Sequence, residues 1–322
     1  MNFFSHMIMI PTLILFSVIP MMMSNMILIW FIMEISNFMF ISFMITSMKQ
    51  KKMIFMYFLV QITASFMLMF PLIVNYLSFH IHEQIILFLS LFMKTGVPPL
   101  HLWMPVISKF MPWLCIFFML TTQKLSPMIL FFLININKQV INLIIVLTMI
   151  VPPLCMINLK SIKMLITYSS INQTGWIVML IYLKHQFWML YFILYSTILF
   201  MISSIMKLNE MSMKFFSYTI KKFNLMFTAM MMNLASMPPF SFFLFKWFST
   251  FTLIMNSNMK MIIIFMLTNS MMMTYIYIKM MMWSLFMNKF ESKMISSFKI
   301  MNNTSYTLIN LLIIITPIMF MI

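Results

Sequence analysis

Four charged side chains lie inside strongly apolar segments of this 322-residue chain, in which 63% of residues are hydrophobic and only 7% are charged. They are Glu34 in "WFIMEISNF", Lys94 in "FMKTGVPPLHLWMP", Lys124 in "LTTQKLSPM" and Lys246 in "MPPFSFFLFKW". A charged side chain at the centre of a membrane helix costs about 2.5 to 3.5 kcal/mol, so each of the four needs a reason. Either they pair to hold helices together, or they line a hydrated path for ions.

A lysine in an apolar environment can carry a proton, because burial makes its neutral form accessible. Glu34 is the single acid at membrane depth, so it cannot be the permanent ion-pair partner of all three lysines. We therefore predict that Lys94, Lys124 and Lys246 relay protons and that Glu34 tunes one of them through a reversible ion pair. The alternatives are permanently paired lysines and, for Glu34, a static salt bridge or a subunit contact.

Adjacent prolines predict a discontinuous helix at "FMKTGVPPLHLWMP". Pro98 and Pro99 lack the N–H groups that would bond the carbonyls of Lys94 and Thr95, and Gly96 removes the steric barrier to unwinding. Open backbone at membrane depth is tolerated only where it is buried in protein or lines a water-filled cavity. The break therefore predicts an ion site. A proline kink used only for packing is the alternative.

The same device recurs in "LASMPPFSFFLFKWF". Pro238 and Pro239 free the carbonyls of Leu234 and Ala235, and Lys246 follows within the same segment. Two proline-broken spans in corresponding positions are typical of inverted internal repeats, with a binding site where the helices are interrupted.

A run of hydroxyl and amide side chains, "TYSSINQTGW", interrupts another apolar segment and predicts a hydrated interior face. The candidate polar relay consists of Tyr168, Ser169, Ser170 and Gln173, together with His101 just after the first break. Hydrogen bonding between helices is the alternative for the run, and a hydrogen-bonded core histidine is the alternative for His101.

Charge and proline divide the chain, whose mean hydropathy is +1.04, into apolar segments near the length of about 20 residues that a membrane helix needs. The sequence predicts an all-α polytopic membrane protein with eleven spans and discontinuous helices near 94–99 and 234–239. The spans are 3–22, 26–47, 53–78, 84–110, 112–134, 140–159, 162–183, 187–206, 223–253, 260–284 and 304–322. Residues 1–134 and 140–284 are the two predicted inverted five-helix repeats, and 304–322 is a C-terminal helix outside the symmetry.

Amino-acid usage indicates an origin in an animal mitochondrion with an A/T-rich genome. All 20 basic residues are lysine, aspartate is absent, and methionine occurs 49 times. Residues with G/C-rich codons are scarce, and so many methionines suggest a code in which a second A/T-only codon is read as methionine.

The lysines also predict an orientation. Fourteen fall in loops after even-numbered spans and three, Lys138, Lys184 and Lys260, after odd-numbered ones. Positive loops stay on the side where the protein is made, so we place the N-terminus on the matrix side and the C-terminus on the intermembrane-space side. The net charge of +16 is scattered over a chain with too little polar surface for a basic soluble domain, so a nucleic-acid partner is not expected.

No Gly-rich phosphate loop, catalytic triad, haem motif or cysteine cluster occurs in the sequence. Cys115 and Cys155 lie in separate apolar segments and match no metal or redox spacing, which predicts small buried hydrophobic side chains. We therefore expect neither a cofactor nor a metal in this chain, which can move charge but shows no means of redox chemistry.

Six stretches resemble, in family order, the chain 2 family of mitochondrial NADH–ubiquinone oxidoreductase, antiporter-like membrane subunits of respiratory complex I. They are "WFIMEISN", "YFLVQITAS", "FMKTGVPPLHLWMP", "TTQKLSP", "TYSSINQTGW" and "MPPFSFFLFKW". The resemblance implies eleven helices, three fewer than in a fourteen-helix ancestor, in the mitochondrial inner membrane. It implies proton translocation driven by other subunits, which hold NADH, FMN, iron–sulfur clusters and ubiquinone. It also implies membrane-arm subunits, supernumerary subunits and lipids as partners.

The resemblance assigns a role to each buried charge. Glu34 matches the glutamate of the family's ion pair, and Lys94 matches the lysine at the first broken helix. Lys124 matches the central-axis lysine, and Lys246 matches the lysine of the second broken helix. A free-standing cation/proton antiporter, a structural spacer in the membrane arm, and a subunit that only transmits coupling are the alternatives.

Three departures from the family pattern affect these expectations. Gln173, which cannot titrate, stands where the family often has a histidine. Ser36 lies two residues after the glutamate, where asparagine is usual, and Asn37 follows it. Ser236 and Met237 replace a common glycine–leucine pair at the second break, so its geometry is expected to differ.

Overall fold

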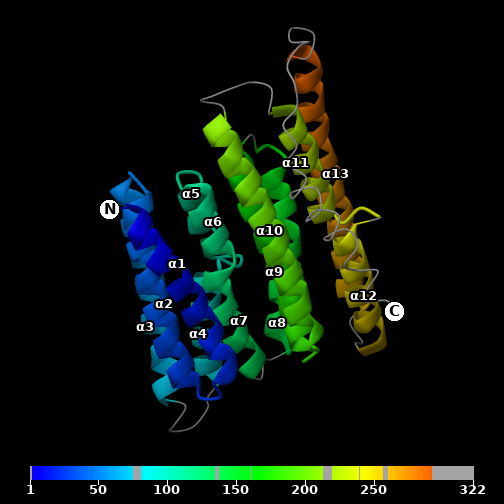
Figure 1. The fold of residues 1–322 in the computed structure, drawn as a ribbon. Coiled ribbons are helices and arrows are strands. Elements are labelled where there is room, and N and C mark those ends of the chain that lie inside the picture. Colours follow the sequence, from blue (N-terminus) through cyan, green and yellow to red (C-terminus); the bar gives the residue numbers. More distant parts are fainter. Residues whose placement is uncertain are drawn as a thin grey trace. The chain divides into compact units, whose positions relative to one another are not determined.

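The computed structural model describes residues 2–74, 81–134, 138–159, 161–212, 220–238, 240–256 and 260–291. All regular elements in these ranges are helices, with no strand among them, which confirms the predicted all-α class (Figure 1). The predicted helix at 304–322 and Pro239 lie outside the described residues.

The chain forms two compact units, Met1–Trp188 and Met189–Ile322. The first contains α1 (Asn2–Val18), a 3-10 turn (Ile19–Met22), α2 (Met26–Ser47), α3 (Lys51–Val74), α4 (Ile81–Thr95), α5 (Trp103–Ser108), α6 (Trp113–Leu120), α7 (Thr122–Leu133), α8 (Lys138–Met156) and α9 (Ile162–Tyr182). After α10 (Phe187–Ser212), which starts at the boundary, the second contains α11 (Ile220–Leu234), α12 (Ser241–Asn256) and α13 (Lys260–Glu291). The predicted repeats stay a prediction, because compactness does not report internal symmetry.

Two helices with buried polar side chains, α7 and α9, form the centre of the first unit. α7 packs against α1, α2, α4, α6 and α9, and α9 in turn packs against α5, α6, α7 and α8. Every residue of α7 from Thr122 to Phe131 is buried, and α9 is buried from Leu165 to Ile181. A helix enclosed on all sides can place its polar side chains only against other helices. The segments with Lys124 and "TYSSINQTGW" are therefore interior, as predicted.

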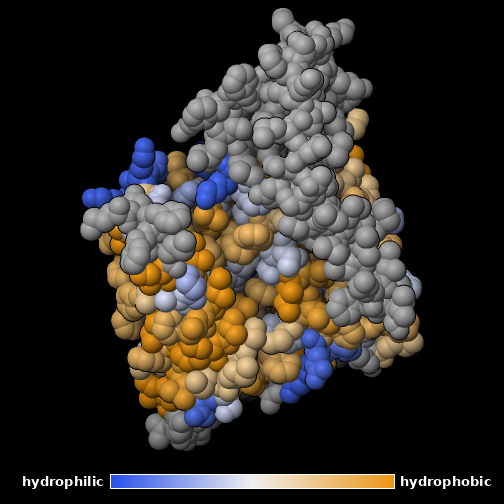
Figure 2. All heavy atoms as spheres, viewed as in Figure 1, coloured by the Kyte–Doolittle hydropathy of each residue, from blue (hydrophilic) through white to orange (hydrophobic). Residues whose placement is uncertain are grey.

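Apolar side chains cover the outside of the described helices. Met22 is 85% exposed and Phe66 is 73% exposed, whereas three lysines in the helices are almost completely buried. Hydrophobic residues cover most of the described surface on the face in Figure 2. Within the described ranges, five helical stretches are long and apolar enough to cross a membrane: Met26–Ser47, Lys51–Ile73, Trp113–Leu133, Phe187–Lys207 and Met261–Met282. Apolar outside and charged inside is the pattern of a protein dissolved in lipid.

The first predicted break is present between α4 and α5. The Val97 N–H donates to the Phe92 carbonyl at 3.0 Å, and Gly96 between them has φ +67. This is the Schellman arrangement, in which a residue in the left-handed region closes the last helical turn. Trp103 starts the next helix only after Pro98 and Pro99, so the chain stays non-helical across the proline pair.

The second predicted break, between α11 and α12, closes in the same way. The Met237 N–H donates to the Met232 carbonyl at 3.3 Å, and Ser236 holds the intervening left-handed position with φ +55. Pro238 follows directly, as Pro98 follows Val97 in the first break.

A third interruption was not predicted, because residues 112–134 were expected to form one continuous helix. Thr121, with φ −116 and ψ −78, separates α6 from α7. The Thr121 and Thr122 hydroxyls donate to the carbonyls of Phe117 and Phe118 at 2.7 and 2.9 Å. Threonine hydroxyls bonded back to the preceding turn bend helices, and Pro127 removes a further backbone donor from the next turn.

Candidate functional site

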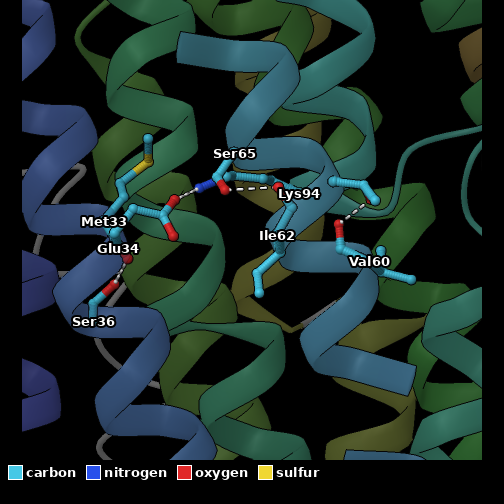
Figure 3. Close-up of polar contacts among 8 residues, drawn as sticks. Met33, Glu34, Ser36, Val60, Ile62, Ser65 and Lys94 are labelled. Atoms are coloured by element: carbon cyan, nitrogen blue, oxygen red, sulfur yellow. Dashed lines mark hydrogen bonds and ion pairs between the residues drawn. The ribbon is translucent and has the colours of Figure 1, made fainter. Parts of the chain in front are cut away.

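Glu34 and Lys94 form an ion pair between α2 and α4. Lys94 Nζ lies 2.5 Å from Glu34 Oε1. Figure 3 shows the two side chains reaching toward each other, while the Ser36 and Ser65 hydroxyls bond back to their own helices. The Lys94 side chain is 2% exposed and that of Glu34 is 16% exposed. The Glu34 carboxylate is therefore partly accessible from outside the helices. The positive charge of Lys94 is enclosed and is balanced by this carboxylate.

Aromatic side chains next to this pair were missed in the sequence. The Trp103 indole N–H donates to the Met93 carbonyl at 3.1 Å, which ties α5 to the last turn of α4. Tyr57 is fully buried, and its ring meets Trp103 edge-on at 5.9 Å and Phe40 at 5.3 Å. The position of Tyr57 in "YFLVQITAS" was the available signal, because aromatic side chains inside a protein favour edge-on packing against one another.

Lys124 is 1% exposed and donates from Nζ to Ser170 Oγ at 3.1 Å, from α7 to α9. The Ser170 hydroxyl donates in turn to the Thr167 carbonyl at 2.6 Å, so its oxygen lone pairs face the lysine. Among the described residues, no carboxylate lies within ion-pair distance of Lys124. An uncompensated buried charge costs several kcal/mol, so this site favours a lysine that can give up its proton.

Gln123 connects the helix of Lys124 to the helix of Glu34. Its amide Nε2 donates to the Ser36 carbonyl at 3.3 Å, from α7 to α2. Because Gln123 adjoins Lys124 and Ser36 lies two residues after Glu34, this bond fixes the relative position of the two charged helices.

The predicted polar relay is brought together only in part. The His101 and Tyr168 rings meet edge-on with centroids 6.0 Å apart, so the residue after the first break contacts the polar helix. Ser170 contacts Lys124, as described above. Ser169 donates to its own helix at the Ile166 carbonyl, 2.7 Å away, and Gln173 is buried further along α9. The structure thus supports two contacts of the relay, one at Lys124 and one at His101.

At the second break, Lys246 is buried and donates from Nζ to Ser236 Oγ at 3.0 Å. Its ammonium also lies 5.7 Å from the centre of the Phe242 ring, a cation–π contact. Asn233 Oδ1 accepts the Phe242 N–H at 3.1 Å, which satisfies an open donor of the first turn of α12. Asn233 and its partner Ser241 were missed, although a serine directly before an apolar run is a helix-start signal.

Gly96→Ala is expected to destabilise the first break. An added Cβ would lie 2.5 Å from the end of the Met104 side chain, which can move, but φ +67 would remain. Holding alanine in the left-handed region costs about 1 to 2 kcal/mol. We expect a lower thermal midpoint and less assembled protein after mild detergent extraction. The control is Ser90→Ala, which removes a hydroxyl bonded to its own helix. Equal midpoints for the two variants would contradict this reading of Gly96.

The chain matches the family described as NADH:quinone oxidoreductase/Mrp antiporter, TM, over residues 21–316. It is similar to NADH-ubiquinone oxidoreductase chain 2 of Anopheles gambiae, with 28% identity over 250 residues, 74% of this chain and 70% of the relative. The same protein of Aedes aegypti is 30% identical over 238 residues, 70% of this chain and 64% of the relative. For Papio hamadryas the identity is 28% over 298 residues, 87% and 85% of the two chains.

Two solved structures share the fold. A chain of respiratory complex I from Thermus thermophilus superimposes with a TM-score of 0.71 at 17% identity, covering 83% of this chain and 68% of the other. A chain of the Mrp complex from Dietzia sp. gives 0.68 at 14% identity, covering 78% and 55%. The family resemblance drawn from the motifs is confirmed: this chain, an all-helical membrane protein, belongs to the NADH:quinone oxidoreductase/Mrp antiporter family.

Proposed function

We propose that the chain is a core membrane-arm subunit of a proton-pumping NADH–ubiquinone oxidoreductase in the mitochondrial inner membrane. Its relatives in insects and mammals carry the name NADH-ubiquinone oxidoreductase chain 2, which supports the proposal that this chain is a subunit of that complex. The pumping role rests on the position of Lys124. This lysine is buried with the Ser170 hydroxyl as its partner. Its helix, α7, is hydrogen-bonded through Gln123 to α2, the helix of the Glu34–Lys94 pair.

In the proposed mechanism, Lys124 is protonated while the Glu34–Lys94 ion pair is closed and loses its proton when the pair opens. While Glu34 holds Lys94, the positive charge of Lys94 is compensated. When a field from the redox part of the complex opens the pair, the uncompensated charge disfavours a second ammonium on Lys124. Lys124 then gives its proton to the path beyond it, with Ser170 as its first polar contact. Lys246 in the second unit repeats this role at its own broken helix.

The energy for this cycle comes from outside the chain. Moving one charge against 100 mV costs about 2.3 kcal/mol, and the buried lysines supply no such energy themselves. We propose that NADH, FMN, iron–sulfur clusters and ubiquinone are held by other subunits. Membrane-arm subunits, supernumerary subunits and lipids are the proposed partners of the apolar surface.

We further propose the finer topology of eleven spans, with the N-terminus in the matrix and the C-terminus in the intermembrane space. Two inverted repeats, 1–134 and 140–284, are part of this proposal. Both breaks close a helix on a left-handed residue, Gly96 or Ser236, and continue into a proline two residues later. This shared closure supports a common origin of the two halves.

Assembly is the first expected result to measure. After mild detergent extraction and separation of native inner-membrane complexes, we expect mass spectrometry to locate this chain in the band that oxidises NADH. One rival to this proposal is a free-standing cation/proton antiporter, a reading compatible with the Mrp-like fold. Migration of the chain outside the NADH-oxidising band, together with ion exchange by the isolated chain in liposomes, would favour that rival and overturn the proposal.

A further inference from the structure

Ser236 occupies a backbone conformation that favours glycine. Its φ is +55, and the corresponding residue of the first break is Gly96, with φ +67. Both positions lie between the hydrogen-bonded residues that close a helix, Phe92 and Val97 in one case and Met232 and Met237 in the other. The two breaks therefore use the same closure with a different residue at its strained position.

The Ser236 side chain uses this position to contact the buried charge. Its hydroxyl donates to the Ala235 carbonyl at 2.6 Å and accepts from Lys246 Nζ at 3.0 Å. Both Ser236 and Lys246 are buried, at 8% and 5% exposure. Because the single hydroxyl proton is directed to Ala235, the oxygen lone pairs face the lysine. Glycine here would fit the backbone but would offer no side-chain acceptor.

We infer that Ser236 is a positioning residue for proton transfer at the second break, where its hydroxyl holds the protonated Lys246 against the end of α11. The inference rests on the proposed function, because it requires that Lys246 carries protons. It adds that loss of the Lys246 proton weakens the bond to Ser236. The protonation of Lys246 is thereby linked to the short backbone segment that joins α11 to α12.

Scarcity of glycine is the competing explanation for this serine. The chain has only two glycines, and Lys184 at the end of α9 also has a positive φ, 51°. The His185 N–H donates there to the Leu180 carbonyl at 3.2 Å, the same helix closure. Biased codon usage alone can thus place a non-glycine residue at such a turn. The two explanations differ in what glycine would do at position 236.

The test compares Ser236→Gly with Ser236→Asn in the assembled complex, reconstituted in vesicles. Glycine relieves the strained φ and removes the acceptor, whereas asparagine tolerates positive φ and carries an amide oxygen. We expect Ser236→Gly to assemble normally and to translocate protons about tenfold more slowly, the effect of losing a hydrogen bond to a charged group. Ser236→Asn is expected to restore most of the rate. Lys184→Gly, which relieves similar strain elsewhere, is the matched control and is expected to pump normally.

Normal pumping by Ser236→Gly would overturn the inference, and so would failure of Ser236→Asn to restore the rate. Loss of assembly in Ser236→Gly would also overturn it, because the serine would then be structural. Lys246→Met separates this inference from the proposed function. If Lys246→Met stops pumping and Ser236→Gly does not, only the role of Ser236 fails; if both pump normally, the proton-carrying role of Lys246 fails as well.

Discussion

Lys124→Met is expected to stop coupled proton translocation while the complex still assembles. The substitution replaces a fully buried amine by an unbranched apolar side chain of similar size, so the packing of α7 is kept. What is lost is the titratable group and its bond to Ser170. Replacement of a buried charge by a well-packed apolar side chain is often neutral or stabilising, so folding is not expected to suffer.

The measurement is proton uptake into vesicles that contain the purified complex, together with the rate of NADH oxidation. Lys124→Arg tests whether charge alone suffices, because a guanidinium keeps its proton; we expect it to be inactive as well. The control is Lys163→Met. Lys163 donates to the Met111 carbonyl at 2.9 Å, lies over the Trp113 ring, and belongs to no part of the proposed path. Normal pumping by Lys124→Met would refute the assignment of Lys124.

The helix breaks could be predicted from the sequence because their causes are local. Pro98 and Pro99 each leave open the carbonyl four residues before them, and Gly96 permits the left-handed turn, so these effects do not depend on the rest of the fold. Burial of Lys124 could also be predicted, since an apolar segment with one charge must place it inside a membrane protein. The interruption at Thr121 had a local signal in two adjacent threonines before Pro127. Threonine also occurs in straight helices, so this signal was too weak to predict a break.

Partners of the buried charges could not be predicted from the residues alone, because they depend on which helices pack together. Ser170 contacts Lys124 because α9 packs on α7. Asn233 reaches Phe242 only after the chain has turned at Ser236. Glu34 had three lysines to choose from, and the fold brings Lys94 within reach of it because α2 and α4 both pack against α3 and α7. Burial of the charged residues could therefore be expected from the sequence, while their pairings required the fold.

Glu34→Gln is expected to have the next largest effect on stability and pumping, because it leaves the buried charge of Lys94 without its partner. Glutamine keeps the shape of Glu34 but not its charge, so Lys94, whose side chain is 2% exposed, loses its compensation. Removing one partner of a buried ion pair costs about 3 to 5 kcal/mol. We expect a lower thermal midpoint, less assembled complex and little coupled pumping.

The asymmetric burial of the pair provides the decisive comparison. Lys94→Met leaves a carboxylate that is less buried than the ammonium, at 16% against 2% exposure, so it is expected to destabilise less than Glu34→Gln. The double variant removes both charges and is expected to recover assembly and thermal midpoint relative to Glu34→Gln, but not pumping. Such non-additivity is the signature of a coupled pair. If the stability losses of the single variants simply add in the double variant, the two residues do not act as a unit. The ion pair would then have no place in the proton path.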